Sequence, residues 1–170
     1  MRSIMSLDSQ DLTALACPWC GRTPPPAVFG LKTVREGEVV GMIAAAPASA
    51  LNGPYLEGST VIVQAWVRRP EVGEQIGTQL MHRLAATQTH RGVRALIAPG
   101  TYGVPNCQHL PAAFLDGLGF LETVPGAQWR MDLRSTIRVP DAVQAVADAV
   151  SRILRPGRPA AANRSRWNNG

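Results

Sequence analysis

The chain has 170 residues with a formal net charge of +5, and 45% of them are hydrophobic while 17% are charged. This length suits one domain, and the hydrophobic content excludes an intrinsically disordered chain. No apolar run approaches the roughly 20 residues of a membrane-spanning helix, so we expect a soluble domain without a membrane partner. A single lysine among 17 basic side chains is typical of arginine-rich proteins from GC-rich bacteria.

The excess positive charge lies at the end of the sequence. Four arginines and no acid follow residue 154, which leaves 13 basic and 12 acidic side chains, a net charge of +1, in residues 1 to 154. A terminal segment of this composition is typical of a flexible tail, so we expect no specific nucleic-acid partner. The first residues lack the apolar segment of a signal peptide, and three cysteines, an odd number, favour free thiols in the cytoplasm.

The first part of the chain predicts a short strand and a brief helix. Residues 3–7 form the strand pattern, and Asp8 or Ser9 is suited to cap a helix over 11–15. Pro18 then ends the helix, because proline lacks the N–H that a helix interior needs.

A hairpin and a third strand are expected next. The β-rich runs 27–35 and 38–47 flank a Glu-Gly pair, which indicates a tight turn between antiparallel strands. A loop follows, and the more apolar run 59–69 predicts another strand.

The middle of the sequence predicts a strand–helix–strand unit. Ile76, Leu80 and Leu84 recur at helical spacing, and Gly92 is suited to end this helix. The apolar run 93–99 then predicts a buried strand, parallel to the strand before the helix.

The remaining elements are a short helix within 111–119, a hairpin of residues 120–124 and 127–134, and a helix over 140–154 whose valine stripe suits packing on this domain or a homodimer contact. We therefore divide the chain into four segments: an N-terminal strand, helix and CPWC loop (1–26), a core (27–134), a C-terminal helix (135–155) and a basic flexible tail (156–170).

The turn between the third strand and the long helix is a candidate phosphate site. A glycine-containing turn at a helix N-terminus presents backbone N–H groups and a positive dipole end to a pyrophosphate. Neither the Walker A pattern nor the G-x-G-x-x-G fingerprint occurs in it.

The order of elements and two motifs resemble the GNAT superfamily of N-acetyltransferases, from about Val39 to Leu133. The acyl-CoA loop of that family, V-x-P-x-x-R-G-x-G-x-G/A, corresponds to Val67, Arg69, Val72, Gly73, Gln75 and Gly77. The family's L-Y-E-x-x-G-F stretch corresponds to Phe114, Leu115, Asp116, Gly119 and Phe120.

This resemblance implies an α/β (α+β) fold with a mixed, mostly antiparallel sheet, one splayed parallel strand pair and flanking helices. It implies an acyl-CoA-dependent N-acyltransferase that uses acetyl-CoA as cosubstrate and acetylates a small-molecule or peptide amine by direct attack. The implied cofactor contacts are Ala65, Trp66, Val67, Val72, Gly73, Glu74, Gln75, Ile76, Gly77 and Thr78.

Departures from the family pattern keep a second interpretation open, a catalytically inactive module that binds acyl-CoA or a protein partner. Val72 stands at the arginine position, Gln75 replaces a glycine, and proline is displaced to Pro70. Leu115 occupies the position of a tyrosine that often protonates the leaving thiolate, and leucine has no proton to donate.

Three residues are candidates for acid or base catalysis. Tyr102 and His109 lie in the loop after the parallel strand, where the family places the thioester sulfur. Histidine titrates near neutral pH, and Tyr102 is a substitute for the missing tyrosine. Glu57, before the third strand, is placed to accept a proton through water.

The cysteines support a third interpretation, a zinc or thiol-redox protein. Cys17 and Cys20 have the two-residue spacing of metal or redox pairs. Cys107 and His109 would complete a Cys3His zinc site. Without a second such pair in the sequence, we expect free thiols and no bound metal.

Overall fold

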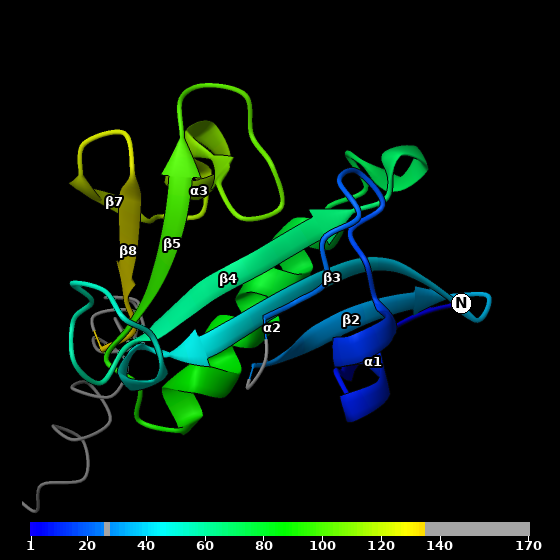
Figure 1. Ribbon diagram of the computed structural model, residues 1–170, viewed down its shortest axis with the longest axis horizontal. Helices are drawn as coiled ribbons and strands as arrows, with labels where there is room; N and C mark the ends of the chain where they lie inside the picture. The colour runs from blue at the N-terminus through cyan, green and yellow to red at the C-terminus, as the bar shows by residue number, and fades with distance from the viewer. Residues whose placement is uncertain (26–27, 135–170) are drawn as a thin grey trace, which may run out of the picture. The chain divides into compact units, whose positions relative to one another are not determined.

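The computed structural model of the protein describes residues 1–25 and 28–134, and the expected C-terminal helix and basic tail lie outside this range (Figure 1). The described residues belong to one compact unit. Among them, no helix is long and apolar enough to cross a membrane.

One mixed sheet organises the described residues, in the order β1-β2-β3-β4-β5-β8-β7 with β6 beside β5. Its strands are β1 (Arg2–Ser6), β2 (Phe29–Arg35), β3 (Glu38–Pro47), β4 (Thr60–Val67), β5 (Ala95–Thr101), β6 (Leu110–Pro111), β7 (Leu121–Val124) and β8 (Gln128–Asp132). The seven-strand path is antiparallel except for the β4–β5 pair, which confirms the expected fold class.

The N-terminal half follows the sequence pattern closely. Glu36 and Gly37 both have positive φ, at 52° and 83°, and form the tight turn between β2 and β3. Asp8 caps the short helix α1 (Ser9–Ala14), and its carboxylate accepts from the backbone N–H groups of Gln10 and Asp11.

This cap makes stability depend on pH. Hydrogen bonding from the backbone N–H of Asp11 holds the pKa of Asp8 below its ordinary value of 3.8. A carboxyl whose pKa is lowered by folding stabilises the protein above its unfolded-state pKa and loses that contribution as the pH falls through the folded-state pKa.

We therefore expect Asp8→Asn, which preserves the cap because asparagine accepts the same bonds, to flatten the fall in unfolding free energy at pH values below about 4. Urea unfolding of both proteins at pH 7 and pH 3 checks this. Parallel pH profiles for the two proteins would contradict it.

The parallel strand pair separates soon after it starts. Between β4 and β5 only Thr60–Leu96 and Val61–Ile97 pair, and the two strands then diverge as a V in Figure 1. The helix α2 (Ile76–His90) connects them and packs against β2, β3 and β4. Beyond the two paired positions, no strand of the described residues neighbours this edge of β4.

The described residues form three hydrophobic clusters. The largest includes Ile76, Leu80 and Leu84 of α2 together with Leu115 and Trp129. A smaller one contains Cys17, Met42, Trp66 and Cys107, so the N-terminal loop and the loop after β5 share a core.

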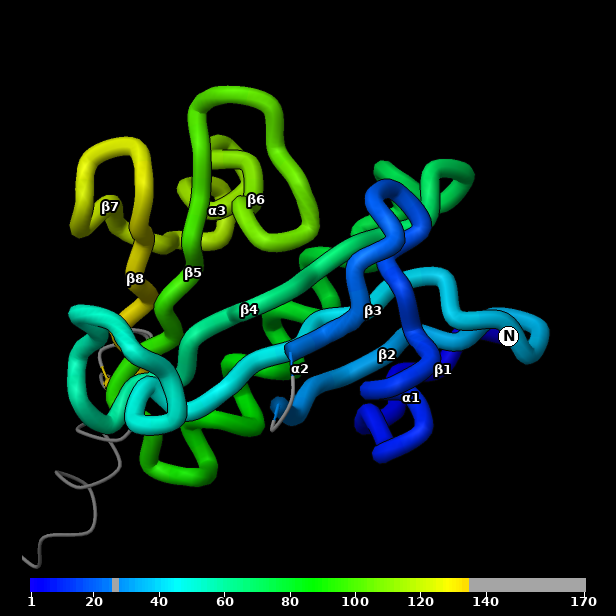
Figure 2. The backbone as a smooth tube through the Cα atoms, in the orientation of Figure 1, coloured from blue at the N-terminus to red at the C-terminus, as the bar shows by residue number. Residues whose placement is uncertain are grey.

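Short elements in the loops were not expected from the sequence. Single 3-10 turns cover Ala48–Ala50 and Arg69–Glu71. The strand β5 continues to Thr101, past the end of the expected strand 93–99, and the two-residue strand β6 lies at the end of the loop that follows. Figure 2 shows the chain rising from β5 and returning to the helix α3 (Ala112–Gly117).

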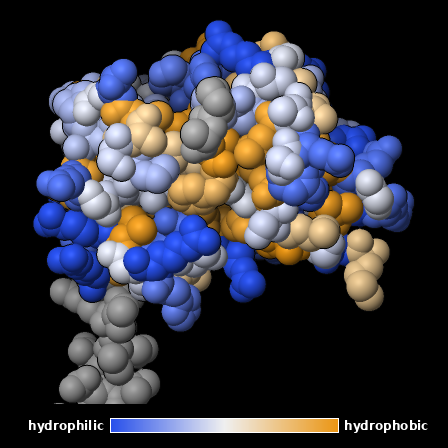
Figure 3. All heavy atoms as spheres, turned by 60° about the horizontal axis from the view of Figure 1, so that its bottom comes forward, coloured by the Kyte–Doolittle hydropathy of each residue, from blue (hydrophilic) through white to orange (hydrophobic). Residues whose placement is uncertain are grey.

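The surface also carries apolar side chains. On the face drawn in Figure 3 they gather in the centre, between hydrophilic rims. Large hydrophobic residues that are exposed include Trp19, Val72, Tyr102, Val104 and Leu121.

Candidate functional site

The free edge of β4 is defined by its pairing with β3. Arg68 donates its N–H to the carbonyl of Val40, and bonded and non-bonded positions alternate along an antiparallel pair. The backbone N–H and C=O groups of Trp66 therefore point toward β3. Those of Ala65 and Val67 point the other way, toward the edge from which β5 diverges.

Two loops already use part of this edge. The N–H of Ala65 donates to the carbonyl of Cys107 at 2.7 Å. The indole Nε1 of Trp19 donates to the carbonyl of Val67 at 2.8 Å, and the guanidinium of Arg69 lies 4.7 Å from the centre of that indole. The other two groups on this edge, the N–H of Val67 and the carbonyl of Ala65, have no hydrogen-bond partner within the described part of the chain.

A cleft of about 710 Å³ lies along this edge. Its walls include Ala65 and Val67 of β4, Gly77 and Thr78 of α2, and Phe114 of α3. Its volume is in the range of cofactor-binding pockets, and most of its lining is apolar. The splay of β4 and β5 thus produces a cavity large enough for an extended ligand.

The start of α2 lines the cleft. Gln75 is the N-cap residue, and its side chain forms no capping hydrogen bond with the described residues of the helix. The N–H groups of Ile76, Gly77 and Thr78 are the first three of the helix and have no partner within it. All three residues line the cleft, so the helix end offers it backbone donors and a positive dipole.

The N-cap residue itself is strained. Gln75 has φ 60° and ψ 15°, the left-handed conformation, which costs a side-chain-bearing residue about 1–2 kcal/mol. Glycine adopts it freely but loses more entropy on folding, by about 0.5–1 kcal/mol. Gln75→Gly is therefore expected to raise the unfolding free energy by roughly 0.5 kcal/mol, measured by urea denaturation. A decrease in the unfolding free energy by more than that amount would contradict the proposal that Gln75 is strained.

Two arginines of the sheet compensate the charge of Glu74 in this turn. Arg35 of β2 forms an ion pair with Glu74, and this hydrogen bond holds the pKa of Glu74 below its usual range. Arg2 of β1 is 3.6 Å from the same carboxylate. The side chain of Glu74 is thereby engaged by the sheet, and the turn carries no uncompensated negative charge there.

Nine of the ten residues that the family resemblance implies as cofactor contacts line the cleft, and Glu74 does not. The three acid–base candidates lie elsewhere. Tyr102 is 67% exposed and donates its hydroxyl to Glu122, which raises its pKa. His109 is exposed beside Asn106, and Glu57 lies in an exposed turn. None of the three lines the cleft.

Sequence reasoning missed Glu71, which lines the cleft. It is 8% exposed, and its Oε2 has no hydrogen-bond partner among residues 1–25 and 28–134, although Arg68 Nε lies 3.9 Å away. It is the only carboxylate among the described residues that line the cleft. Nothing in the sequence around Pro70 marks it, because its burial depends on the 3-10 turn that follows β4.

The short helix α3 presents Phe114 to the cleft and turns Leu115 into the core, where it is fully buried. We therefore expect Leu115→Tyr to overpack the core and lower the unfolding free energy by about 1–3 kcal/mol. Phe114→Tyr adds the same hydroxyl beside the cleft and is expected to cost less. Thermal unfolding of the two variants distinguishes them, and equal losses would contradict this orientation.

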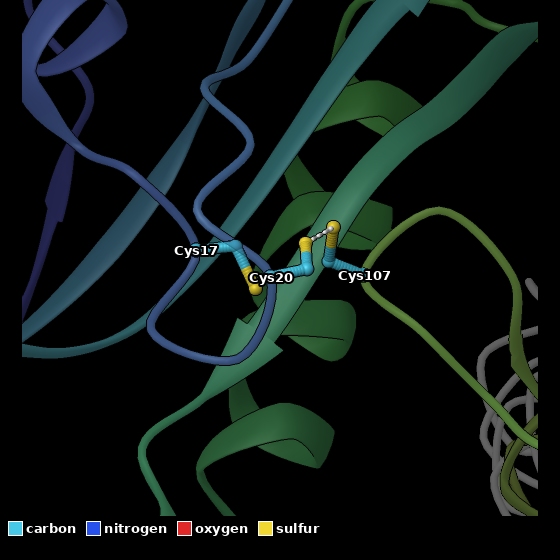
Figure 4. A group of neighbouring side chains, drawn as sticks. All are labelled: Cys17, Cys20 and Cys107. Carbon is cyan, nitrogen blue, oxygen red and sulfur yellow. Dashed lines mark hydrogen bonds between the residues drawn. The ribbon is translucent and has the colours of Figure 1, made fainter.

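The three cysteines lie close together (Figure 4), and Cys20 and Cys107 line the cleft. Their sulfur atoms all lie within 4.8 Å of one another, and those of Cys20 and Cys107 are 3.4 Å apart. Burial raises the pKa of Cys107 to about 12, whereas hydrogen bonds from the backbone of Arg22 and from Cys107 lower that of the exposed Cys20. His109, expected as a fourth ligand, is not part of this group.

Comparisons with known proteins identify the fold. No protein-family model matches the sequence, and no curated protein is found as a relative. Among solved structures, the ribosomal-protein-S18-alanine N-acetyltransferase of Escherichia coli aligns with a TM-score of 0.57 at 17% identity, over 78% of this chain and 94% of that one.

Two further structures agree. A GNAT-family protein of Desulfovibrio desulfuricans, described as an acetyltransferase, has a TM-score of 0.57 at 14% identity and covers 78% of this chain and 99% of its own. An N-acetyltransferase of Staphylococcus aureus has a TM-score of 0.56 at 14% identity with the same coverages. The chain has the fold of the GNAT N-acetyltransferases.

Proposed function

We propose that the protein is an acyl-CoA-dependent N-acyltransferase that moves an acetyl group from acetyl-CoA to an amine. One observation carries this proposal. The free edge of β4 and the uncapped start of α2 border the same cleft of about 710 Å³. An extended ligand with an anionic diphosphate at one end and hydrogen-bonding amides along its arm matches those two features.

The backbone of the chain would hold most of this ligand. The N–H groups of Ile76, Gly77 and Thr78 donate to the diphosphate, because helix N-termini favour anions. The carbonyl of Ala65 and the N–H of Val67 pair with the pantetheine arm as an added strand would. Replacement of a family glycine by Gln75 leaves these contacts possible, since they use main-chain atoms.

The thioester supplies an activated acyl group for direct attack by the amine nitrogen. The N–H of Val67 donates to the oxyanion that forms at the thioester carbonyl, in a cleft whose apolar walls strengthen such a bond. The carbon–sulfur bond then breaks, and the thiolate leaves and takes a proton from solvent, because Leu115 has none to give.

The attacking amine must be neutral, and most primary amines are protonated at pH 7. Glu71 is the proposed group that accepts its proton, directly or through one water, because its Oε2 is buried in the cleft wall and no described residue forms a hydrogen bond with it. An acceptor with a primary amine, on a small molecule or a peptide, is the corresponding substrate class.

Calorimetric titration of the full chain with acetyl-CoA and with desulfo-CoA tests the binding step, and release of free thiol during incubation with a panel of amines tests the transfer. We expect saturable binding of both ligands and amine-dependent thiol release. Binding without thiol release for any amine would support the inactive module instead. Absence of binding at millimolar ligand would refute both.

A further inference from the structure

The cysteine cluster joins two loops that are far apart in sequence. Cys17 and Cys20 belong to the loop after α1, and Cys107 belongs to the loop between β5 and α3. Cys17 and Cys107 are 2% and 4% exposed, and Cys20 is exposed. Their three sulfur atoms nevertheless lie within 4.8 Å of one another.

We propose that Cys17, Cys20 and Cys107 form a zinc site with three thiolate ligands and a fourth position open to water. Tetrahedral zinc binds sulfur at about 2.3 Å, which places two ligating sulfur atoms roughly 3.8 Å apart. The sulfur atoms here lie 3.4 Å apart for Cys20 and Cys107 and within 4.8 Å for all pairs. Small side-chain rotations therefore suffice to admit the ion.

The surroundings suit thiolate ligands. The buried amide Nε2 of Gln64 lies 3.6 Å from the sulfur of Cys107 and is fixed by a 2.9 Å hydrogen bond to the carbonyl of Arg22. Donors of this kind orient metal-bound sulfur and stabilise its charge. The amide of Cys17 donates to the same Arg22 carbonyl, and that of Gly21 donates to Cys17, which closes the loop around the pair.

The fourth coordination position of the zinc ion is left to water because the described residues offer no fourth ligand. Among residues 1–25 and 28–134, no other histidine, cysteine, aspartate or glutamate joins the three sulfur atoms. Cys20 and Cys107 both line the cleft, so we place the open position on its side.

The ion would connect the two loops that lie on the edge of β4. The indole N–H of Trp19, next to Cys20, donates to the carbonyl of Val67. The carbonyl of Cys107 accepts from the N–H of Ala65. Zinc bound only by the folded protein stabilises it by mass action. It would also fix both loops against the strand that borders the cleft.

Cobalt(II) and zinc(II) added to the full chain, reduced and freed of metal, test the site without any coenzyme or amine. We expect one equivalent of cobalt to give the sulfur-to-cobalt charge-transfer band and the visible bands of tetrahedral coordination, and zinc to displace it. Zinc should also raise the midpoint of thermal unfolding and protect all three thiols of the unmodified sequence from alkylation.

Two variants locate the ligands. Cys20→Ser changes an exposed ligand and is expected to weaken zinc binding by roughly 100-fold or more. The matched control His109→Ala alters a neighbouring potential ligand outside the group and should bind zinc as the parent protein does. If Cys20→Ser fails to fold, alkylation protection in the unmodified sequence decides.

Each of the following results would overturn the proposal: no tetrahedral cobalt spectrum, three thiols that react equally fast with and without zinc, or a loss of binding in His109→Ala as large as in Cys20→Ser. Formation of a Cys20–Cys107 disulfide in air, together with no zinc binding by the reduced protein, would likewise overturn it. These readouts are independent of acyl transfer, so either proposal can fail while the other stands.

Discussion

Replacing Gly77 with valine is expected to weaken acetyl-CoA binding by about tenfold or more, because a branched side chain then enters the cleft at the start of α2. A Cβ at this position would already lie 3.4 Å from the ring of Phe114 and 3.8 Å from Val67. The two methyl groups of valine must extend beyond that point, into the space between β4 and α3.

The fold should tolerate this change, since Gly77 does not have a positive φ. Calorimetric titration with acetyl-CoA measures the loss, and circular dichroism checks the fold. Ala86→Val is the matched control, because it places the same side chain on an exposed position of the same helix. Equal affinities for acetyl-CoA in the two variants would remove Gly77 from the proposed binding site.

Replacing Trp129 with alanine is expected to lower the free energy of unfolding by about 3–5 kcal/mol, the usual cost of deleting a buried aromatic side chain. Trp129 is fully buried and donates its indole N–H to Asp116 at 3.0 Å. Gly100 leaves room for it, since a Cβ there would lie 2.6 Å from the indole ring. The side chain thus holds β8, β5 and α3 together.

Phe114 of α3 lines the cleft. Removing the indole that holds α3 in place is therefore expected to disturb the cleft wall as well. Urea denaturation gives the change, and Leu121→Ala, at a residue 73% exposed, is the control that should stay within about 0.5 kcal/mol of the parent protein. A cost below about 1 kcal/mol for Trp129→Ala would show that this side of the sheet does not depend on the indole.

The order of strands and helices could be predicted because each element has a local pattern. The spacing of Ile76, Leu80 and Leu84 marks α2, and these side chains are buried against the sheet as a helical stripe should be. The Glu36-Gly37 pair likewise marks the β2–β3 turn, since its positive φ values favour glycine. The parallel β4–β5 pair could be predicted from the strand–helix–strand order, because a helix that crosses over the sheet returns the chain in the same direction.

The interior of the candidate site was less accessible to sequence reasoning. The motif comparison drew attention to Leu115, but the phase of a helix of six residues depends on packing, and it is Phe114 that lines the cleft. Tyr102 and His109 are candidates from the sequence because their loop follows the parallel strand, where the resemblance places the thioester sulfur. In the structure it is the carbonyl of Cys107 in that loop that accepts from Ala65 of β4.

Long-range contacts set the remaining features. Cys20 and Cys107 are separated by 87 residues, and no local pattern brings their sulfur atoms together. The burial of Glu71 depends on the turn after β4 and on the sheet behind it. Such positions are decided by tertiary packing, which periodicity and turn chemistry do not describe.

A crystal structure of the full chain with acetyl-CoA tests the proposed site most directly. The predicted result is a diphosphate within hydrogen-bond distance of the N–H groups of Ile76, Gly77 and Thr78, and a thioester carbonyl oxygen that accepts from the N–H of Val67. Acetyl-CoA bound away from the edge of β4, or a diphosphate without contact to the start of α2, would contradict it.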